Sequence, residues 1–150
     1  MNDASFTYDY KKQPPLNLIE AYPDESWELS YLVKGAELVG QEGSEVPPMI
    51  SGDVMLFPPT LTHNWSFNCQ IVNEDGEVEF IRLFLPVSFL ERLVQNFPEY
   101  QEIMAHLQQY TWPVRYESLQ ANRIIEELEI MRELSDIERI PHVMHLLSLL

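Results

Sequence analysis

A histidine and a tryptophan two residues apart mark the part of this sequence best suited to binding a small molecule. His63 and Trp65 follow a turn, a short apolar run at 54–57 and a pair of prolines. Residues two apart on an extended strand point to the same side, so the imidazole and the indole are expected together at the rim of a small barrel. Such a pair suits a sugar or another small polar ligand. The alternative is that His63 is a hydrogen-bonded structural histidine and Trp65 a core anchor.

Glu28 and Ser30 form a second candidate pair, because they share one face of an expected strand at 27–33. Apolar and aromatic residues alternate with them and occupy the other face, as in a half-buried sheet. We therefore expect Glu28 and Ser30 to line the same cavity as His63 and Trp65. The alternative for Glu28 is a solvent-facing position, which is common for a glutamate in an antiparallel strand.

The other histidines and the cysteine give weaker signals. His142 and His145 are three apart in an expected helix and are spaced to touch one ion, but no matching partner is evident, and His106 lies in another expected helix. A metal site needs several histidine or carboxylate ligands that converge. Cys69 has no neighbouring base, and no glycine-rich phosphate loop or Gly-x-Ser-x-Gly motif is present. The sequence therefore predicts no metal, no cofactor and no catalytic centre.

The elements that must position these side chains change character at Pro86. Before it, apolar residues alternate with polar ones, and an Asp-Gly pair predicts a turn ahead of the strongest strand. After it, apolar residues recur at the helical period of about 3.6. The expected strands are 27–33, 54–57 and 78–85, with a weaker edge strand or arm in 1–15. The expected helices begin near 87, 98 and 118, and the last begins near 137 or 141. The sequence therefore predicts a mainly β fold with α: a barrel in 1–85 and helices in 86–150, packed together as one structural unit.

The last expected helix carries an apolar stripe that has two possible uses. Val143, Leu146, Leu147 and Leu150 stand at i, i+3, i+4 and i+7. A short striped helix is marginal in water without a partner surface. We expect the C-terminal stripes both to cover the barrel and to pair with the same helices of a second chain in a homodimer. Because the apolar run reaches Leu150 without a helix-ending residue, we also expect the gene product to continue beyond it.

Charge and composition disfavour several kinds of partner. Twenty-four acidic against nine basic side chains give a formal net charge of −15, and such a field repels phosphate backbones and anionic lipids. The first residues lack the basic start and apolar core of a signal peptide, and no run reaches the roughly 18 apolar residues of a membrane span. The single cysteine cannot form an internal disulfide. We therefore expect a cytoplasmic protein whose own residues contact neither nucleic acid nor membrane.

The order of these segments resembles a cupin (jelly-roll) barrel followed by helices, and more narrowly the N-terminal effector-binding and dimerisation domain of AraC-type transcription regulators. The resemblance covers nearly the whole chain and is carried by 27–35, 52–59 with His63-Asn64-Trp65, 84–90, 97–99 and 146–150. It implies a cupin-like barrel in 1–85, a helical dimerisation segment in 86–150 and a small-molecule effector. It also implies that DNA is contacted only through a C-terminal helix-turn-helix domain, which is absent from these 150 residues.

Individual residues match the two cupin motifs. Glu28 and Gly35 match the acidic residue and the glycine of the first motif, and Gly52, Pro58 and His63 match the second.

Several departures from the metal-binding cupin pattern change the expected chemistry. Where such cupins keep two histidines before the glutamate, this chain has Tyr22 and Asp24, and the second motif has Thr60 and Phe67 in place of a glycine and an asparagine. The resemblance therefore implies a barrel that binds an effector without a metal. Two alternatives stay open: a stand-alone metal-dependent cupin isomerase or oxygenase acting on a small polar substrate, and an interaction module whose barrel is filled by its own side chains.

Overall fold

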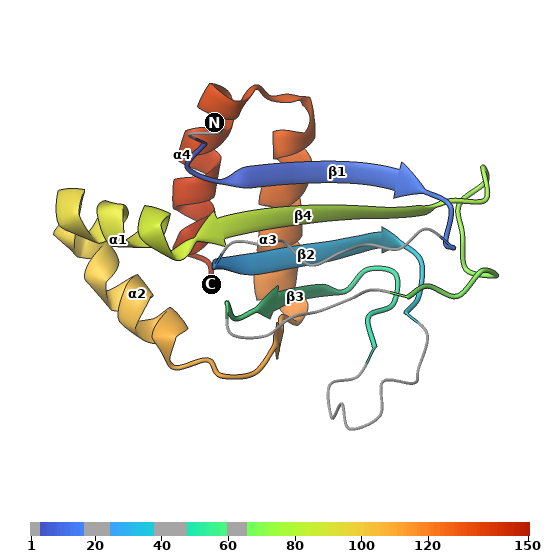
Figure 1. Ribbon diagram of the computed structural model, residues 1–150, viewed down its shortest axis with the longest axis horizontal. Helices are drawn as coiled ribbons and strands as arrows, with labels where there is room; N and C mark the ends of the chain where they lie inside the picture. Colours follow the sequence, from blue (N-terminus) through green and yellow to red (C-terminus); the bar gives the residue numbers. More distant parts are fainter. Residues whose placement is uncertain (1–3, 17–24, 38–47, 60–65) are drawn as a thin grey trace.

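In the computed structural model, the described residues are 4–16, 25–37, 48–59 and 66–150 (Figure 1). Within them, five strands form one antiparallel sheet in the order β1-β4-β2-β3-β5. The strands are β1 Thr7–Gln13, β2 Ser26–Lys34, β3 Val54–Phe57, β4 Val78–Pro86 and β5 Val114–Arg115. The α-helices are α1 Val87–Asn96, α2 Gln101–Gln108, α3 Ser118–Ile130 and α4 Asp136–Leu147, and the 3₁₀ helices are η1 Pro98–Tyr100 and η2 Met131–Glu133. The predicted order, a β-rich part followed by helices, is confirmed.

The strands coincide closely with the strand ranges that the sequence predicts. β2, β3 and β4 each cover the predicted range, and β1 lies at the edge of the sheet, paired with β4. The turn predicted before β4 is built by Asn73, whose Oδ1 accepts hydrogen bonds from the backbone N–H of Asp75 and Glu77, both at 2.9 Å. Gly76 has φ +76°, a conformation that favours glycine.

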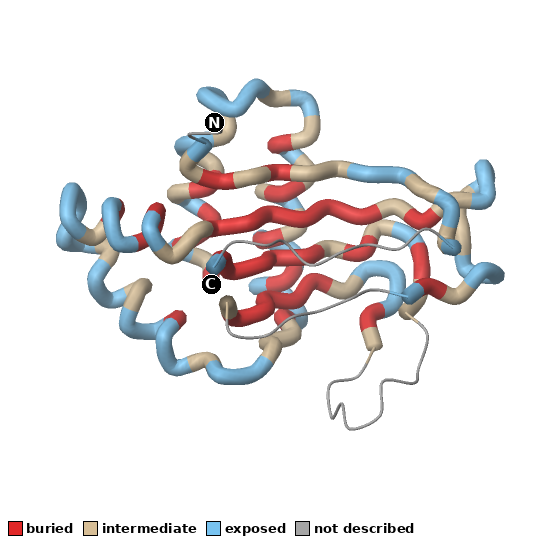
Figure 2. The backbone as a smooth tube through the Cα atoms, viewed as in Figure 1, coloured by how far each residue is buried: buried red, intermediate tan, exposed pale blue. Residues whose placement is uncertain are grey.

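One face of the sheet packs against α3 and α4, which cross behind the strands in Figure 1. Leu29 of β2, Leu83 of β4 and Leu128 of α3 are fully buried in the apolar core between the two layers. Burying each such side chain stabilises the fold by about 1.5–3 kcal/mol. The central strands β2 and β4 are buried along most of their length (Figure 2). Tyr8 extends this packing to the edge strand, since its hydroxyl donates a 2.6 Å hydrogen bond to the carbonyl of Leu128.

The chain returns to the sheet between its helices, which the sequence did not indicate. After α1, η1 and α2 at one end of the sheet, Val114 and Arg115 pair with Leu56 and Met55 of β3. Arg115 also forms an ion pair with Asp53, just before β3. A strand of two residues is too short to show a period, so only its tertiary partners define it.

None of the helices in the described ranges combines the length and hydropathy that crossing a lipid bilayer requires.

The helix α4 begins at Asp136, where Ser135 and Glu138 form a capping box. Its predicted dimerisation stripe faces the core of the same chain. The exposed fractions are 0% for Val143 and Leu146, 1% for Leu147 and 7% for Leu150. These four residues are therefore part of the core of this chain, which is one of the two uses expected of the stripe, and their contact with a second chain stays a prediction. The exposed apolar residues of α4 are instead Ile137 and Ile140.

A carboxylate of α3 binds both histidines of α4. The Nδ1 atoms of His142 and His145 lie 2.9 Å and 2.8 Å from the two carboxylate oxygens of Glu127. Burial raises the pKa of Glu127, but the two histidine hydrogen bonds outweigh it, so this pKa lies below its usual value. A carboxyl group with a depressed pKa in the folded state stabilises the fold above its unfolded-state pKa of about 4.3. That stabilising contribution is lost as the pH falls from the unfolded-state pKa through the lower folded-state pKa.

We expect Glu127→Gln to remove this part of the pH dependence. Between pH 6 and pH 3, the free energy of unfolding of the wild type should fall more steeply than that of the variant, as measured by urea unfolding at each pH. Glu126→Gln, which changes an exposed neighbour on the same helix, is the matched control and should keep the wild-type slope. Equal slopes for the wild type and Glu127→Gln would show that the two histidines do not act on this carboxylate.

Candidate functional site

Four polar or charged side chains gather on the sheet face opposite α3 and α4. The strand register places Asp9 of β1, Arg82 of β4 and Ser30 of β2 side by side in one row across the sheet. Glu28, two residues before Ser30, points to the same side, in a row between Phe84 and Phe57. We refer to Glu28, Ser30 and Arg82, the buried members, as the polar network.

The polar network is closed by two short hydrogen bonds on one carboxylate. Arg82 Nη2 donates to Glu28 Oε1 at 2.7 Å, and the Ser30 hydroxyl donates to Glu28 Oε2 at 2.7 Å. The side chains of Arg82 and Glu28 are only 7% and 10% exposed, and Ser30 is fully buried. The guanidinium also lies 4.7 Å from the centre of the Phe84 ring, a favourable cation–π distance. Both charges are thus compensated, as buried charges must be.

The network brings Glu28 and Ser30 into contact on one sheet face, while their role in ligand binding stays a prediction, and it adds a residue that the sequence reasoning missed. Glu28 is buried, so the alternative expectation that this glutamate faces solvent is wrong. Arg82 was overlooked because it lies inside the most apolar strand, 78–85. That placement was itself a usable signal, since a charge in the middle of a buried strand needs a partner nearby.

On the central strands β2, β3 and β4, the residues of this face beside the network are apolar. The second core cluster comprises Leu32, Met49, Met55, Phe57, Phe67, Val78 and Phe80. Phe67 and Phe80 stack with ring centroids 6.2 Å apart. Phe67, which stands where the cupin motif has an asparagine, is therefore a core residue. The polar network thus borders a packed apolar cluster, and few polar groups in apolar surroundings are the usual composition of a small-molecule site.

The other residues taken from the motifs have structural roles or fall outside the described ranges. Gly35 has φ +150°, and a Cβ atom added there would lie 3.1 Å from Val78. Gly52 has φ +96°, in the turn before β3. His63 and Trp65 lie in 60–65, outside the described residues, so their predicted place at the rim stays a prediction. Within the described ranges, no three His, Cys, Asp or Glu side chains are arranged to hold a metal ion.

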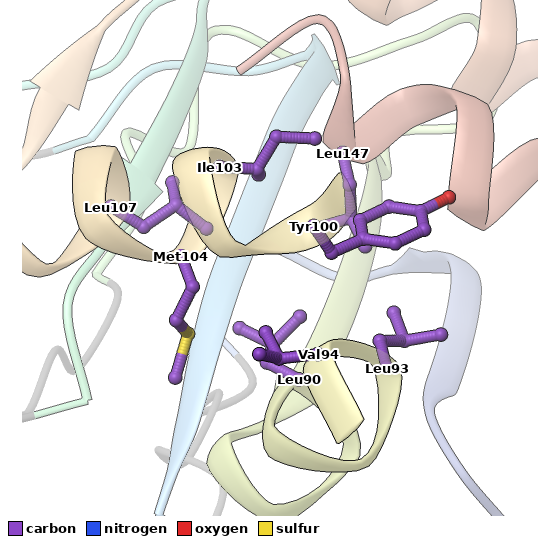
Figure 3. A pocket seen from close by; sticks show the side chains of 8 residues that line it. All are labelled: Leu90, Leu93, Val94, Tyr100, Ile103, Met104, Leu107 and Leu147. Atoms are coloured by element: carbon purple, nitrogen blue, oxygen red, sulfur yellow. The ribbon is translucent and has the colours of Figure 1, made fainter. Parts of the chain in front are cut away.

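A separate hollow lies between the helices at the end of the sheet (Figure 3). It has an empty volume of about 190 Å³, part of which is open to solvent. Its lining is Leu90, Leu93, Val94, Tyr100, Ile103, Met104, Leu107 and Leu147. No charged side chain lines this hollow to orient a polar ligand, and the only lining hydroxyl, that of Tyr100, lies 3.4 Å from the Met144 carbonyl. The polar network is therefore the better candidate for binding a polar molecule.

The comparisons with known proteins identify the fold. No family model and no curated protein matches the sequence. Among solved structures, apo ToxT from Vibrio cholerae strain SCE256 superposes with a TM-score of 0.54, at 12% identity over 93% of this chain. ToxT from Vibrio cholerae in a P21 crystal form gives a TM-score of 0.54, at 14% identity over 96% of this chain. ToxT from Vibrio cholerae O395 bound to (E)-4-(8-methylnaphthalen-1-yl)but-3-enoic acid gives 0.52, at 14% identity over 95%. The matches cover 52%, 55% and 54% of those chains, so this chain spans about half their length. The described sheet and helices thus share the fold of one part of ToxT.

Proposed function

We propose that residues 1–150 form the ligand-sensing and dimerisation part of an AraC-type transcription regulator. In this proposal a cupin-like barrel without a metal binds a small polar effector. ToxT is a regulator of the AraC family rather than an enzyme, and one of its structures holds a small organic molecule. The shared fold supports a regulatory role, and the proposal accordingly assigns no catalytic residue.

The buried polar network is the observation that carries the proposal. Glu28, Ser30 and Arg82 bring a carboxylate, a hydroxyl and a guanidinium into 2.7 Å contacts beside apolar residues of the central strands. Apolar side chains of equal size at such positions are often as stable or more stable, so an ion pair kept there suggests a use beyond stability. We propose that this network orients the effector, with His63 and Trp65 at its rim.

The remaining parts of the proposal concern the partners. Two chains would form a homodimer, and the exposed Ile137 and Ile140 of α4 are the apolar side chains of that helix available for contact. DNA would be bound by a helix-turn-helix domain that is not among these residues, in keeping with the net charge of −15. The regulator would act in the cytoplasm, and effector binding would change how the helices pack and so bias the arrangement of two DNA-binding domains.

A ligand screen on the purified protein tests the sensing role. We expect a thermal-shift screen of small polar metabolites to yield a compound whose affinity, measured by calorimetry, falls by about tenfold or more in Glu28→Gln. This change keeps the shape of the side chain but removes the charge that holds Arg82. Glu126→Gln, on the exposed side of α3, should bind as the wild type does. A compound that binds both variants with equal affinity would place the effector elsewhere.

A further inference from the structure

The strand β1 is an outer strand of the described sheet. It pairs with β4 on one side, and no described strand pairs with its other side. The backbone N–H and C=O groups along the outer side of an edge strand can pair with a strand of another chain. Lysine on an edge strand usually opposes such pairing. The effect of the exposed Lys11 and Lys12 therefore depends on which residues of another strand lie opposite them.

The sequence of β1 is self-complementary for antiparallel pairing with a second copy of the chain. A twofold axis at Tyr10 places Asp9 of each copy directly opposite Lys11 of the other, so this pair of opposite charges forms twice. Opposite charges at directly opposed positions stabilise a strand pair, whereas like charges destabilise it. An axis at Asp9 or at Lys11 places like charges opposite each other. Charge therefore selects the register centred on Tyr10.

The helices behind β1 are compatible with this twofold axis. The helices α3 and α4 cross behind β1 nearer its start than its end, and their connection, which includes η2, extends past the edge of the sheet (Figure 1). The guanidinium of Arg132 in η2 lies 3.9 Å from the centre of the Tyr10 ring, so the connection is held against β1. A twofold rotation at Tyr10 exchanges the two ends of β1. It therefore brings the connection of each copy behind the end of β1 that the helices of the other copy do not cross.

The charge of β1 is opposite in sign to that of the whole chain. Lys11 and Lys12 against Asp9 give the strand Thr7–Gln13 a net charge of +1, whereas the chain carries −15. Two copies with this net charge repel each other at long range. A positively charged strand lowers this repulsion when it is the part that lies closest to the other, acidic copy.

We infer that β1 is the interface of the homodimer: two copies pair edge to edge through antiparallel β1 strands, with Asp9 opposite Lys11 of the second copy, and form one continuous sheet. This inference rests on the homodimer of the proposed function and names its interface. The ion pairs fix the register, and the backbone groups of the two strands supply the hydrogen bonds.

Apolar side chains at the start of α4 extend this interface. Ile137 is 75% exposed and Ile140 43%. Both belong to the end of the helical layer that extends past β1, so they pack behind the sheet of the second copy. Tyr31 lies there in one row with Tyr10 and is only partly buried. The dimer thus buries apolar surface that a single copy leaves in contact with water.

A charge exchange on β1 tests the inference. Lys11→Asp places an acid opposite Asp9 of the second copy in both pairs. We expect the dissociation constant of the dimer, measured by analytical ultracentrifugation at low salt, to rise by about tenfold or more. Asp9→Lys should weaken the dimer in the same way. An equimolar mixture of the two variants should regain a dissociation constant within about threefold of the wild type, because the two introduced charges then lie opposite each other.

The matched control is Lys12→Asp. It changes the charge of the chain as Lys11→Asp does, but Lys12 points to the other face of the sheet and lies opposite Tyr8 of the second copy in the selected register. Its dissociation constant should stay within about threefold of the wild type. Circular dichroism shows whether each variant is folded. If Asp9→Lys does not fold, the difference between Lys11→Asp and Lys12→Asp still decides.

The outcomes separate the inference from the proposed function. If the wild type dimerises and Lys11→Asp dimerises equally well, the interface lies elsewhere on the chain, and the inference is overturned while the homodimer stands. If the wild type stays monomeric up to about 1 mM, the homodimer of the proposed function is wrong, and the inference fails with it.

Discussion

Replacing Arg82 with methionine lowers the free energy of unfolding by about 3–5 kcal/mol. The substitution leaves the carboxylate of Glu28 buried, with the Ser30 hydroxyl as its remaining hydrogen-bond donor within the polar network. The pairing with Arg82 no longer offsets the desolvation of this carboxylate. The loss in the free energy of unfolding therefore exceeds that of one broken hydrogen bond. Urea unfolding, monitored by circular dichroism, measures the difference directly.

A second arginine of the sheet provides the matched control. Arg115 pairs with Asp53, but their side chains are 26% and 20% exposed, so solvent screens this pair. We expect Arg115→Met to cost about 1 kcal/mol or less, as partly exposed pairs do. The double variant Glu28→Leu with Arg82→Met should regain most of the lost stability, because no charge stays buried. Equal losses in Arg82→Met and Arg115→Met would contradict the burial argument.

Introducing aspartate at Leu146 prevents stable folding instead of separating a dimer. The side chain is fully buried between α4 and the sheet. A charge at this position has no partner, and the cavity and desolvation costs together are expected to exceed about 4 kcal/mol, close to the whole stability of a small domain. We expect the variant to lose its cooperative thermal transition.

The helix α4 also has an exposed position where an introduced charge should leave the fold stable. Ile137 is 75% exposed, and Ile137→Asp should change the free energy of unfolding by no more than about 0.5 kcal/mol. If two chains pair through the exposed side of α4, this variant should weaken the dimer in sedimentation while it stays folded. A folded Leu146→Asp protein with wild-type stability would show that α4 does not pack as described.

The strands were predictable because their sequence patterns are local. β2 alternates long enough to reveal a period of two, β3 and β4 are apolar runs, and Asn73 to Gly76 carries the turn chemistry in the sequence itself. The strand β5 was not predictable, since its two residues join the sheet only through β3 and the ion pair between Asp53 and Arg115.

The site was predictable in part for the same reason. Glu28 and Ser30 are two residues apart, so a local rule places them together, whereas Arg82 lies 54 residues away from Glu28 and meets it through strand pairing. Glu127 and His142, on neighbouring helices, are likewise joined only by the fold. The stripe ending in Leu150 was assigned both to the core and to a second chain. Periodicity identifies an apolar face but does not say what covers it.

The most direct test of the sensing role is the structure of the protein with its effector bound. The account predicts that the molecule lies on the sheet face opposite α3 and α4, with polar atoms within hydrogen-bond distance of Glu28, Ser30 or Arg82. An effector found in the hollow between α1 and α2, against Leu93 and Met104 with the polar network untouched, would contradict it.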